Sequence, residues 1–176
     1  MYKRQGERVV DITPHQRHEA FEGMSVRGLR GRTRAFIKIQ DGCERYCSYC
    51  IIPTARGPIR SKPLTDIRAE LEGLVENGYK EVVLVGINLS SYGKDLGLRL
   101  IDAVKLACSV EGLHRVRLGS LEPELLSDED LSEMAKLCLL YTSVFTPGFV
   151  NIACNTPHKT VKRLIVSKIR RRFVNL

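Results

Sequence analysis

The spacing of apolar residues predicts a strand followed by a helix in the first half of the chain. Residues 35–40 alternate between two faces with a period of two, which is typical of a β-strand. A helix over about residues 63–78 follows, because its apolar positions fall at i, i+4, i+7 and i+8 and Asn77-Gly78 ends it. The run 81–85 (EVVLV) is a continuous apolar strand, as expected where a parallel sheet is covered on both faces.

The same alternation then repeats. An apolar stripe over residues 100–108 predicts a second helix, and residues 115–119 (RVRLG) predict a short strand. Ser127 with Asp130 three residues later resembles a capping box that opens a third helix. Repeated strand-helix units predict a parallel sheet with right-handed crossovers, either open or part of a barrel.

In both architectures the chemistry lies at the carboxyl ends of the strands. Three loops follow the three predicted strands, at residues 41–53, 86–95 and 120–124. We therefore expect these loops to share one edge of the sheet.

Composition narrows the class of protein. The chain has 176 residues, enough for about one domain, and its 43% hydrophobic and 27% charged residues disfavour disorder. No apolar run approaches the roughly 20 residues of a membrane helix, and the N-terminus lacks the apolar region of a signal peptide. We expect a cytoplasmic protein without a membrane partner.

The net charge of +8 is concentrated at one end of the sequence. Residues 138–176 hold seven Lys and Arg and no Asp or Glu, so the first 137 residues are nearly neutral. A basic segment favours nucleic-acid phosphates, but such a charge run is also compatible with a solvated surface.

A cysteine triplet is the strongest chemical signal. Cys43, Cys47 and Cys50 have C-x3-C-x2-C spacing in the first of the three loops, and cysteines in a cytosolic chain favour metal binding or catalysis over disulfides. Zinc is the main alternative, but a structural zinc site is closed by four ligands. The next cysteine is Cys108 and the next histidine His114, neither at finger-like spacing. Three local thiolates suit a four-iron cluster better, with the fourth iron open to a small molecule.

The triplet, with Tyr49 just before its last cysteine, resembles the signature of the radical S-adenosylmethionine (SAM) enzymes. Three segments, at residues 33–61, 78–97 and 117–126, resemble the tRNA methylthiotransferases in order and spacing. The strings GINLSSYG and LGSLEPE are most similar to the branch that acts on N6-threonylcarbamoyladenosine.

This resemblance, which covers about residues 30–137, implies a fold class and a domain organisation. The expected fold is α/β, a partial (βα) barrel of the radical SAM type with the first three or so βα units and an irregular C-terminal tail. Residues 1–32 would be a linker or entering segment, and residues 33–137 the N-terminal half of the radical SAM core. Residues 138–176 are an unassigned basic tail that departs from the family's pattern.

The resemblance also implies a set of cofactor ligands. Cys43, Cys47 and Cys50 would hold a 4Fe-4S cluster whose open iron chelates SAM. One-electron reduction would then cleave SAM to a 5′-deoxyadenosyl radical that abstracts hydrogen from adenine C2. No residue of this chain is assigned to catalysis itself. Five residues at the ends of the three strands would contact SAM: Tyr49, Gly86, Asn88, Ser120 and Glu122. The last four could also serve only to shape the turns that follow their strands.

The function implied is that of a fragment of an enzyme that inserts a methylthio group at adenine C2 of N6-threonylcarbamoyladenosine in tRNA, inactive alone. Its partners would be tRNA, through the full-length protein, and a one-electron reductant such as a flavodoxin or ferredoxin. The resemblance also implies a second 4Fe-4S cluster in a further N-terminal domain, and no cysteine precedes Cys43 in this sequence. The alternatives are a sister enzyme acting on isopentenyladenosine in tRNA or on a ribosomal protein, and a non-catalytic metal- or RNA-binding module.

Overall fold

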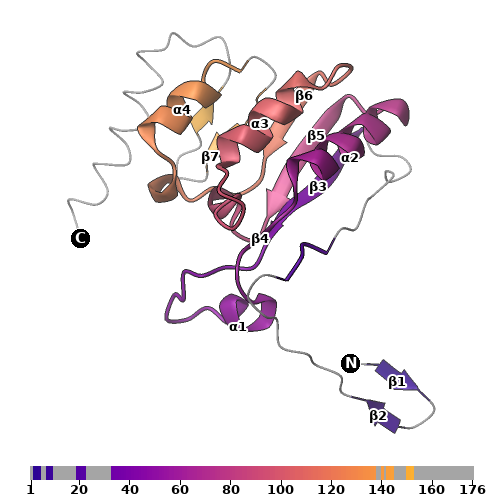
Figure 1. Cartoon of the computed structure of the whole chain (residues 1–176), viewed down its shortest axis with the longest axis vertical. Coiled ribbons are helices and arrows are strands. Elements are labelled where there is room, and N and C mark those ends of the chain that lie inside the picture. The colour runs from indigo at the N-terminus through magenta and orange to yellow at the C-terminus, as the bar shows by residue number, and fades with distance from the viewer. Residues whose placement is uncertain are drawn as a thin grey trace.

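A curled four-stranded sheet forms the centre of the molecule, with the strands in the order β4-β3-β5-β6. The computed structural model describes residues 2–4, 7–9, 19–22, 33–137, 140, 142–144 and 150–152. The strands of the sheet are β3 (Arg34–Asp41), β4 (Arg60–Ser61), β5 (Glu81–Gly86) and β6 (Arg115–Leu118). Figure 1 shows the longer helices packed side by side on one face of this sheet.

The predicted order of strands and helices is confirmed. Strands β3, β5 and β6 pair in parallel, and the helices α2 (Leu64–Glu76), α3 (Leu100–Ser109) and α4 (Asp128–Met134) follow them in turn. This arrangement is the predicted α/β partial barrel. No helix in the described part of the chain is long and apolar enough to cross a bilayer.

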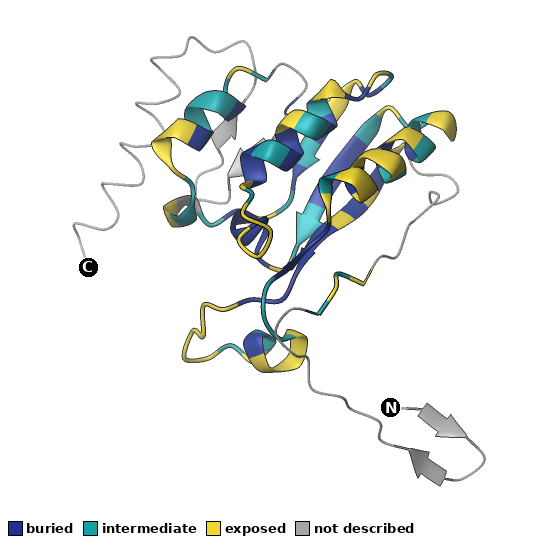
Figure 2. Ribbon diagram, in the orientation of Figure 1, coloured by how far each residue is buried: buried dark blue, intermediate teal, exposed yellow. Residues whose placement is uncertain are grey.

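The core lies between the sheet and the helices, as Figure 2 shows by the buried residues on their facing sides. On β3, Ile37 and Ile39 are completely buried, whereas Phe36 on the opposite face is 41% exposed. The predicted stripe of α2 supplies Ile67 and Leu71, which are also completely buried. Each such side chain stabilises the fold by about 1.5–3 kcal/mol through its removal from water. The spacing of apolar residues along the strand and along the helix therefore decides which face of each element points inward.

The predicted cap of the last helix is present. The Ser127 side chain accepts a hydrogen bond from the backbone N–H of Asp130 at 3.0 Å, which satisfies one of the free donors at the start of α4. This contact fixes where the helix begins after the loop that follows β6.

Replacing Ser127 with alanine is expected to lower the free energy of unfolding by about 1 kcal/mol, because the cap is lost. Ser132→Ala in the same helix is the matched control: its hydroxyl donates to the carbonyl of Asp128, and it is expected to change stability by less than about 0.5 kcal/mol. Urea denaturation of both variants measures the difference, and equal effects would contradict the capping role.

Short elements within the predicted loops are additions that the pattern did not anticipate. The helix α1 (Ile52–Arg56) and the 3-10 helices η1 (Leu89–Ser91) and η2 (Pro123–Leu125) each have three to five residues. Strand β4 has two residues and pairs antiparallel with the end of β3. Elements this short carry no measurable periodicity, so only the folded chain reveals them.

Further strands lie at the two ends of the chain. Strands β1 (Tyr2–Arg4) and β2 (Glu7–Val9) pair antiparallel within the predicted linker. Strands β7 (Thr142–Val144) and β8 (Val150–Ile152) also pair antiparallel. Leu140 forms an isolated parallel bridge with Val116 of β6, just past the predicted boundary at residue 137. Most of the predicted tail lies outside the described residues, and the domain boundaries stay predictions.

Candidate functional site

The loops that follow β3, β5 and β6 lie together at the carboxyl edge of the sheet. The Asn88 side-chain amide after β5 is 3.9 Å from the Cys43 sulfur after β3. The Arg45 guanidinium in the cysteine loop is 3.2 Å from the carboxylate of Glu122, which follows β6. These contacts bring residues far apart in the sequence to one place, as the parallel topology requires.

The cysteine loop comprises residues 42–50. Close backbone packing holds its first residues in place. Gly42 has a φ of +73°, and a Cβ added there would lie 1.8 Å from the carbonyl oxygen of Pro58. The N–H of Cys43 donates to the carbonyl of Gly57 at 3.1 Å. A glycine is therefore required at position 42, both for its conformation and for its lack of a side chain.

The three cysteines of this loop are free thiols with different exposure. Cys43 is buried, Cys47 is exposed and Cys50 is intermediate. In the part of the chain that the structure describes, no three His, Cys, Asp or Glu side chains are close enough to hold a single metal ion. A structural zinc site gathers its four ligands around one atom. In an iron–sulfur cluster the thiolates bind different irons, so three free thiols on one loop fit that group by their chemistry.

A buried polar atom without a partner lies beside the cysteines. Asn88 is 5% exposed, and its Oδ1 makes no hydrogen bond, although buried polar atoms are nearly always paired. Its Nδ2 faces the Cys43 sulfur. The amide therefore offers an acceptor to a polar group bound next to the cysteine loop.

The other residues predicted to contact SAM differ in their surroundings. Tyr49 is 91% exposed, and Ser120 is also exposed. The N–H of Glu122 donates to the Ser90 hydroxyl at 2.8 Å, which fixes the backbone at the end of β6. Gly86 closes β5, and a Cβ there would lie 2.8 Å from the side-chain oxygen of Gln40. The contacts of these residues with SAM remain predictions.

Arg45 is a residue of this site that sequence reasoning missed. Its guanidinium reaches Glu122 at 3.2 Å and Glu124 at 3.4 Å, joining the first loop to the third. The carboxylate of Glu122, followed by Glu124 and the Cys47 sulfur, raises the pKa of Arg45. In the sequence, its position between two of the cysteines indicated only that it lies near the site. That position did not indicate Glu122 as its partner.

Asp41, immediately before the loop, is buried among cations. One carboxylate oxygen accepts from the N–H of Gly42 at 2.8 Å, and the other pairs with Lys38 and lies 3.7 Å from Arg60. Burial raises the pKa of Asp41, but the hydrogen bonds from Lys38 and Gly42, together with the charges of Lys38 and Arg56, outweigh it and hold the pKa below its ordinary value of 3.8. The ionised carboxylate thus stabilises the entrance to the loop.

This pKa predicts a pH-dependent stability. Because the folded-state pKa of Asp41 is lowered, its stabilisation is complete above pH 3.8 and is lost as the pH falls through the lower folded value. Asp41→Asn is expected to lower the free energy of unfolding by about 1–3 kcal/mol at pH 7, with a smaller difference from the natural chain at pH 3. Thermal melts from pH 7 to pH 3 measure this, with the exposed Glu111→Gln as control. A difference that is the same at both pH values would contradict the account.

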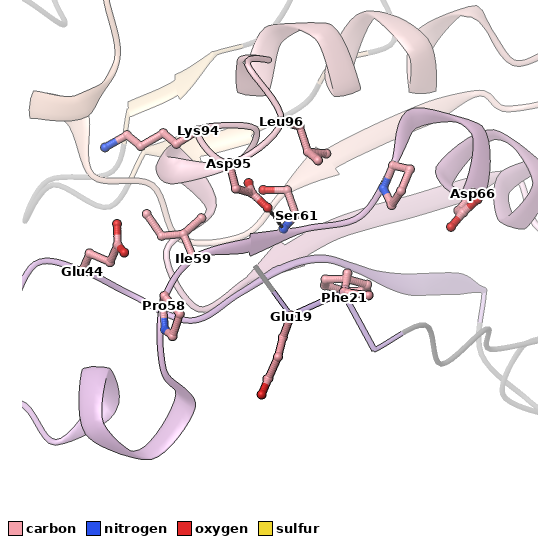
Figure 3. Close-up of a pocket in the computed structure, with 12 residues that line it drawn as sticks. Glu19, Phe21, Glu44, Pro58, Ile59, Ser61, Asp66, Lys94, Asp95 and Leu96 are labelled. Carbon is pink, nitrogen blue, oxygen red and sulfur yellow. Dashed lines mark hydrogen bonds between the residues drawn. The ribbon is translucent and has the colours of Figure 1, made fainter. Parts of the chain in front are cut away.

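A cavity of about 700 Å³ lies next to this site and is shown in Figure 3. Its polar lining includes Glu19, Glu44 and Asp66, and Asp95 accepts a hydrogen bond from the N–H of Ser61 at 2.8 Å. None of the cysteines and none of the residues predicted to contact SAM lines it. The cavity therefore lies beside the loop edge, and Glu44 of the cysteine loop forms part of its wall.

The fold and the site together define a class: an α/β partial barrel with a free-thiol triplet after its first parallel strand. The sequence model of the Radical SAM superfamily matches residues 37–174, and the chain belongs to that superfamily.

Its relatives include proteins named as tRNA methylthiotransferases. It is 48% identical over 99 residues to the threonylcarbamoyladenosine tRNA methylthiotransferase MtaB of Thermotoga maritima, covering 56% of this chain and 23% of the relative. It is 31% identical over 166 residues to MtaB of Bacillus subtilis, covering 92% and 36%. It is 36% identical over 141 residues to the tRNA-2-methylthio-N(6)-dimethylallyladenosine synthase of Clostridium tetani, covering 77% and 31%. The chain thus spans between 23% and 36% of the length of these relatives.

Proposed function

We propose that this chain carries the cluster- and SAM-binding half of a radical SAM methylthiotransferase that acts on tRNA. The observation that supports this most directly is the convergence of three strand-end loops around the cysteine triplet. Asn88 and Arg45 make the contacts that join these loops. A barrel enzyme uses residues from the ends of several strands to orient its substrate at the carboxyl edge of the sheet.

Cys43, Cys47 and Cys50 are proposed to hold a 4Fe-4S cluster. When bound, the cluster supplies the electron for reductive cleavage of SAM. The exposed Cys47 and the intermediate Cys50 leave the loop accessible from solvent, whereas the buried Cys43 fixes one ligand against the sheet.

The unpaired Oδ1 of Asn88 is a suitable acceptor for the amino group of SAM, because it is buried beside Cys43 and has no partner. Gly86 lies at the same strand end and is part of the proposed SAM site through its backbone. Glu122, held by Arg45 and Ser90, is proposed to face the ribose or methionyl part, with Ser120 next to it. The exposed ring of Tyr49 is free to pack on the adenine.

The proposed substrate is N6-threonylcarbamoyladenosine in tRNA, in the cytoplasm, with methylthio insertion at adenine C2. The strings GINLSSYG and LGSLEPE, together with the 48% identity over 99 residues to a relative named for that nucleoside, support this branch. The full-length protein would add a second 4Fe-4S cluster and the contacts with tRNA. A flavodoxin or ferredoxin would supply the electron.

Mass spectrometry of tRNA nucleosides from a strain that lacks the full-length gene tests this proposal. We expect 2-methylthio-N6-threonylcarbamoyladenosine to disappear and its unthiolated precursor to accumulate. Loss of the dimethylallyl nucleoside instead would move the protein to the sister branch. An unchanged set of tRNA nucleosides would contradict a role in tRNA methylthiolation.

A further inference from the structure

Gln40 lies at an irregularity in the sheet, next to the cysteine loop. The register of β3 against β5 shifts between Lys38, which faces Val85, and Gln40, which faces Gly86. Strict alternation would place Gln40 on the face of the exposed Lys38, yet Gln40 is completely buried. A β-bulge re-aims a side chain in this way, and bulges of this kind are common next to active sites.

The buried amide of Gln40 joins the first two loops of the site. Its Nε2 donates to the carbonyls of Asp41 and Gly42, both at 2.7 Å. Its Oε1 accepts from the backbone N–H of Asn88 at 2.8 Å. Both amide hydrogens and the oxygen are used, and the nature of the three partners fixes which way the amide points. One side chain thus connects the backbone before Cys43 to the residue whose own amide faces Cys43.

Gly86 supplies the space that this arrangement needs. A Cβ at position 86 would lie 2.8 Å from the Oε1 of Gln40 and 2.9 Å from its Cβ. Real Cβ atoms essentially never approach so closely, so a side chain at Gly86 would displace the Gln40 amide. The glycine and the glutamine are therefore complementary parts of one contact.

We propose that Gln40 is a positioning residue that holds the cysteine loop and the loop after β5 in a fixed relation, and that Gly86 is required to admit it. The consequence for SAM rests on the proposed function: Asn88, held by Gln40, keeps its free oxygen beside Cys43, which would be one of the residues that hold the cluster. Gln40 itself makes no contact with SAM in this scheme, because both of its amide groups are already engaged within the protein.

Amide hydrogen exchange in the full 176-residue chain, measured by NMR without a cluster, tests the contact directly. Gln40→Met keeps the side-chain volume and removes all three hydrogen bonds, so the Asn88 N–H is expected to exchange about tenfold faster. Gly86→Ala reaches the same contact from the other side, and the same increase is expected. Leu74→Met, in the core on α2, is the matched control and should leave Asn88 unchanged.

The SAM response of the reconstituted chain is the second readout. With a reduced cluster in place, Gln40→Met is expected to need about ten times more SAM for the half-maximal change in the electron paramagnetic resonance spectrum. The proposal is overturned if a folded Gln40→Met or Gly86→Ala variant exchanges the Asn88 N–H at the same rate as the natural chain. It is also overturned if neither variant folds. A third contradicting result is faster exchange of the Asn88 N–H with no change in the SAM concentration that gives the half-maximal spectral change. A natural chain that takes up no iron would defeat the proposed function alone, because the exchange experiment needs no cluster.

Discussion

Cys47→Ala is expected to reduce the iron content of the anaerobically reconstituted chain from about four atoms per chain to fewer than one. The reason is that the loop has three cysteines and the proposed cluster needs all of them as ligands. Cys47 is the exposed central member of this triplet. A cluster left with two protein ligands loses its fixed position on the loop. Iron and sulfide assays together with the visible absorption spectrum measure the loss.

Cys108→Ala is the matched control for this experiment. Cys108 lies on α3, outside the three loops, and packs against the hydrophobic core. We expect this variant to keep its full iron content and to lose only a small part of its stability. Equal iron loss in both variants, or full iron content in Cys47→Ala, would contradict the assignment of the cluster to the triplet.

Gly42→Ala is expected to lower the free energy of unfolding by about 3 kcal/mol or more, or to prevent folding. Two costs add: the positive φ of +73°, worth about 1–2 kcal/mol for a residue with a Cβ, and the collision of that Cβ with the carbonyl of Pro58. Movement away from Pro58 would also break the hydrogen bond from Cys43 to Gly57.

Gly97→Ala separates the two costs. Gly97 has a φ of +65°, but a Cβ there would meet nothing within 4 Å. We expect it to cost only about 1–2 kcal/mol, from backbone conformation alone. Urea denaturation of both variants gives the comparison, and a Gly42→Ala chain no less stable than Gly97→Ala would show that the loop start is not packed as described.

The repeating strand-helix units could be predicted from the sequence because their periodicities are local. The stripe of Ile67 and Leu71 faces the core of α2, and Ser127 caps α4 where the capping pattern predicted it. The shared edge of the three loops also follows from topology, since parallel strands end on one side. Strand β4 and helix α1 could not be predicted, because two and five residues carry no period.

The candidate site was less predictable because its contacts join distant parts of the chain. Simple alternation groups Gln40 with the exposed Phe36 and Lys38, whereas the folded chain buries it where the register of β3 against β5 shifts. The pair of Arg45 and Glu122 depends on how the first and third loops meet, which no local pattern encodes. Cys43, Cys47 and Cys50 stood out because their spacing is a chemical signal in itself.

The most direct test of the account is the electron paramagnetic resonance spectrum of the reduced, iron-reconstituted chain before and after addition of SAM. The account predicts the signal of a single four-iron cluster whose g values change when SAM binds its open iron. A chain that instead takes up one equivalent of zinc, or whose cluster signal is the same with and without SAM, would contradict the central claim.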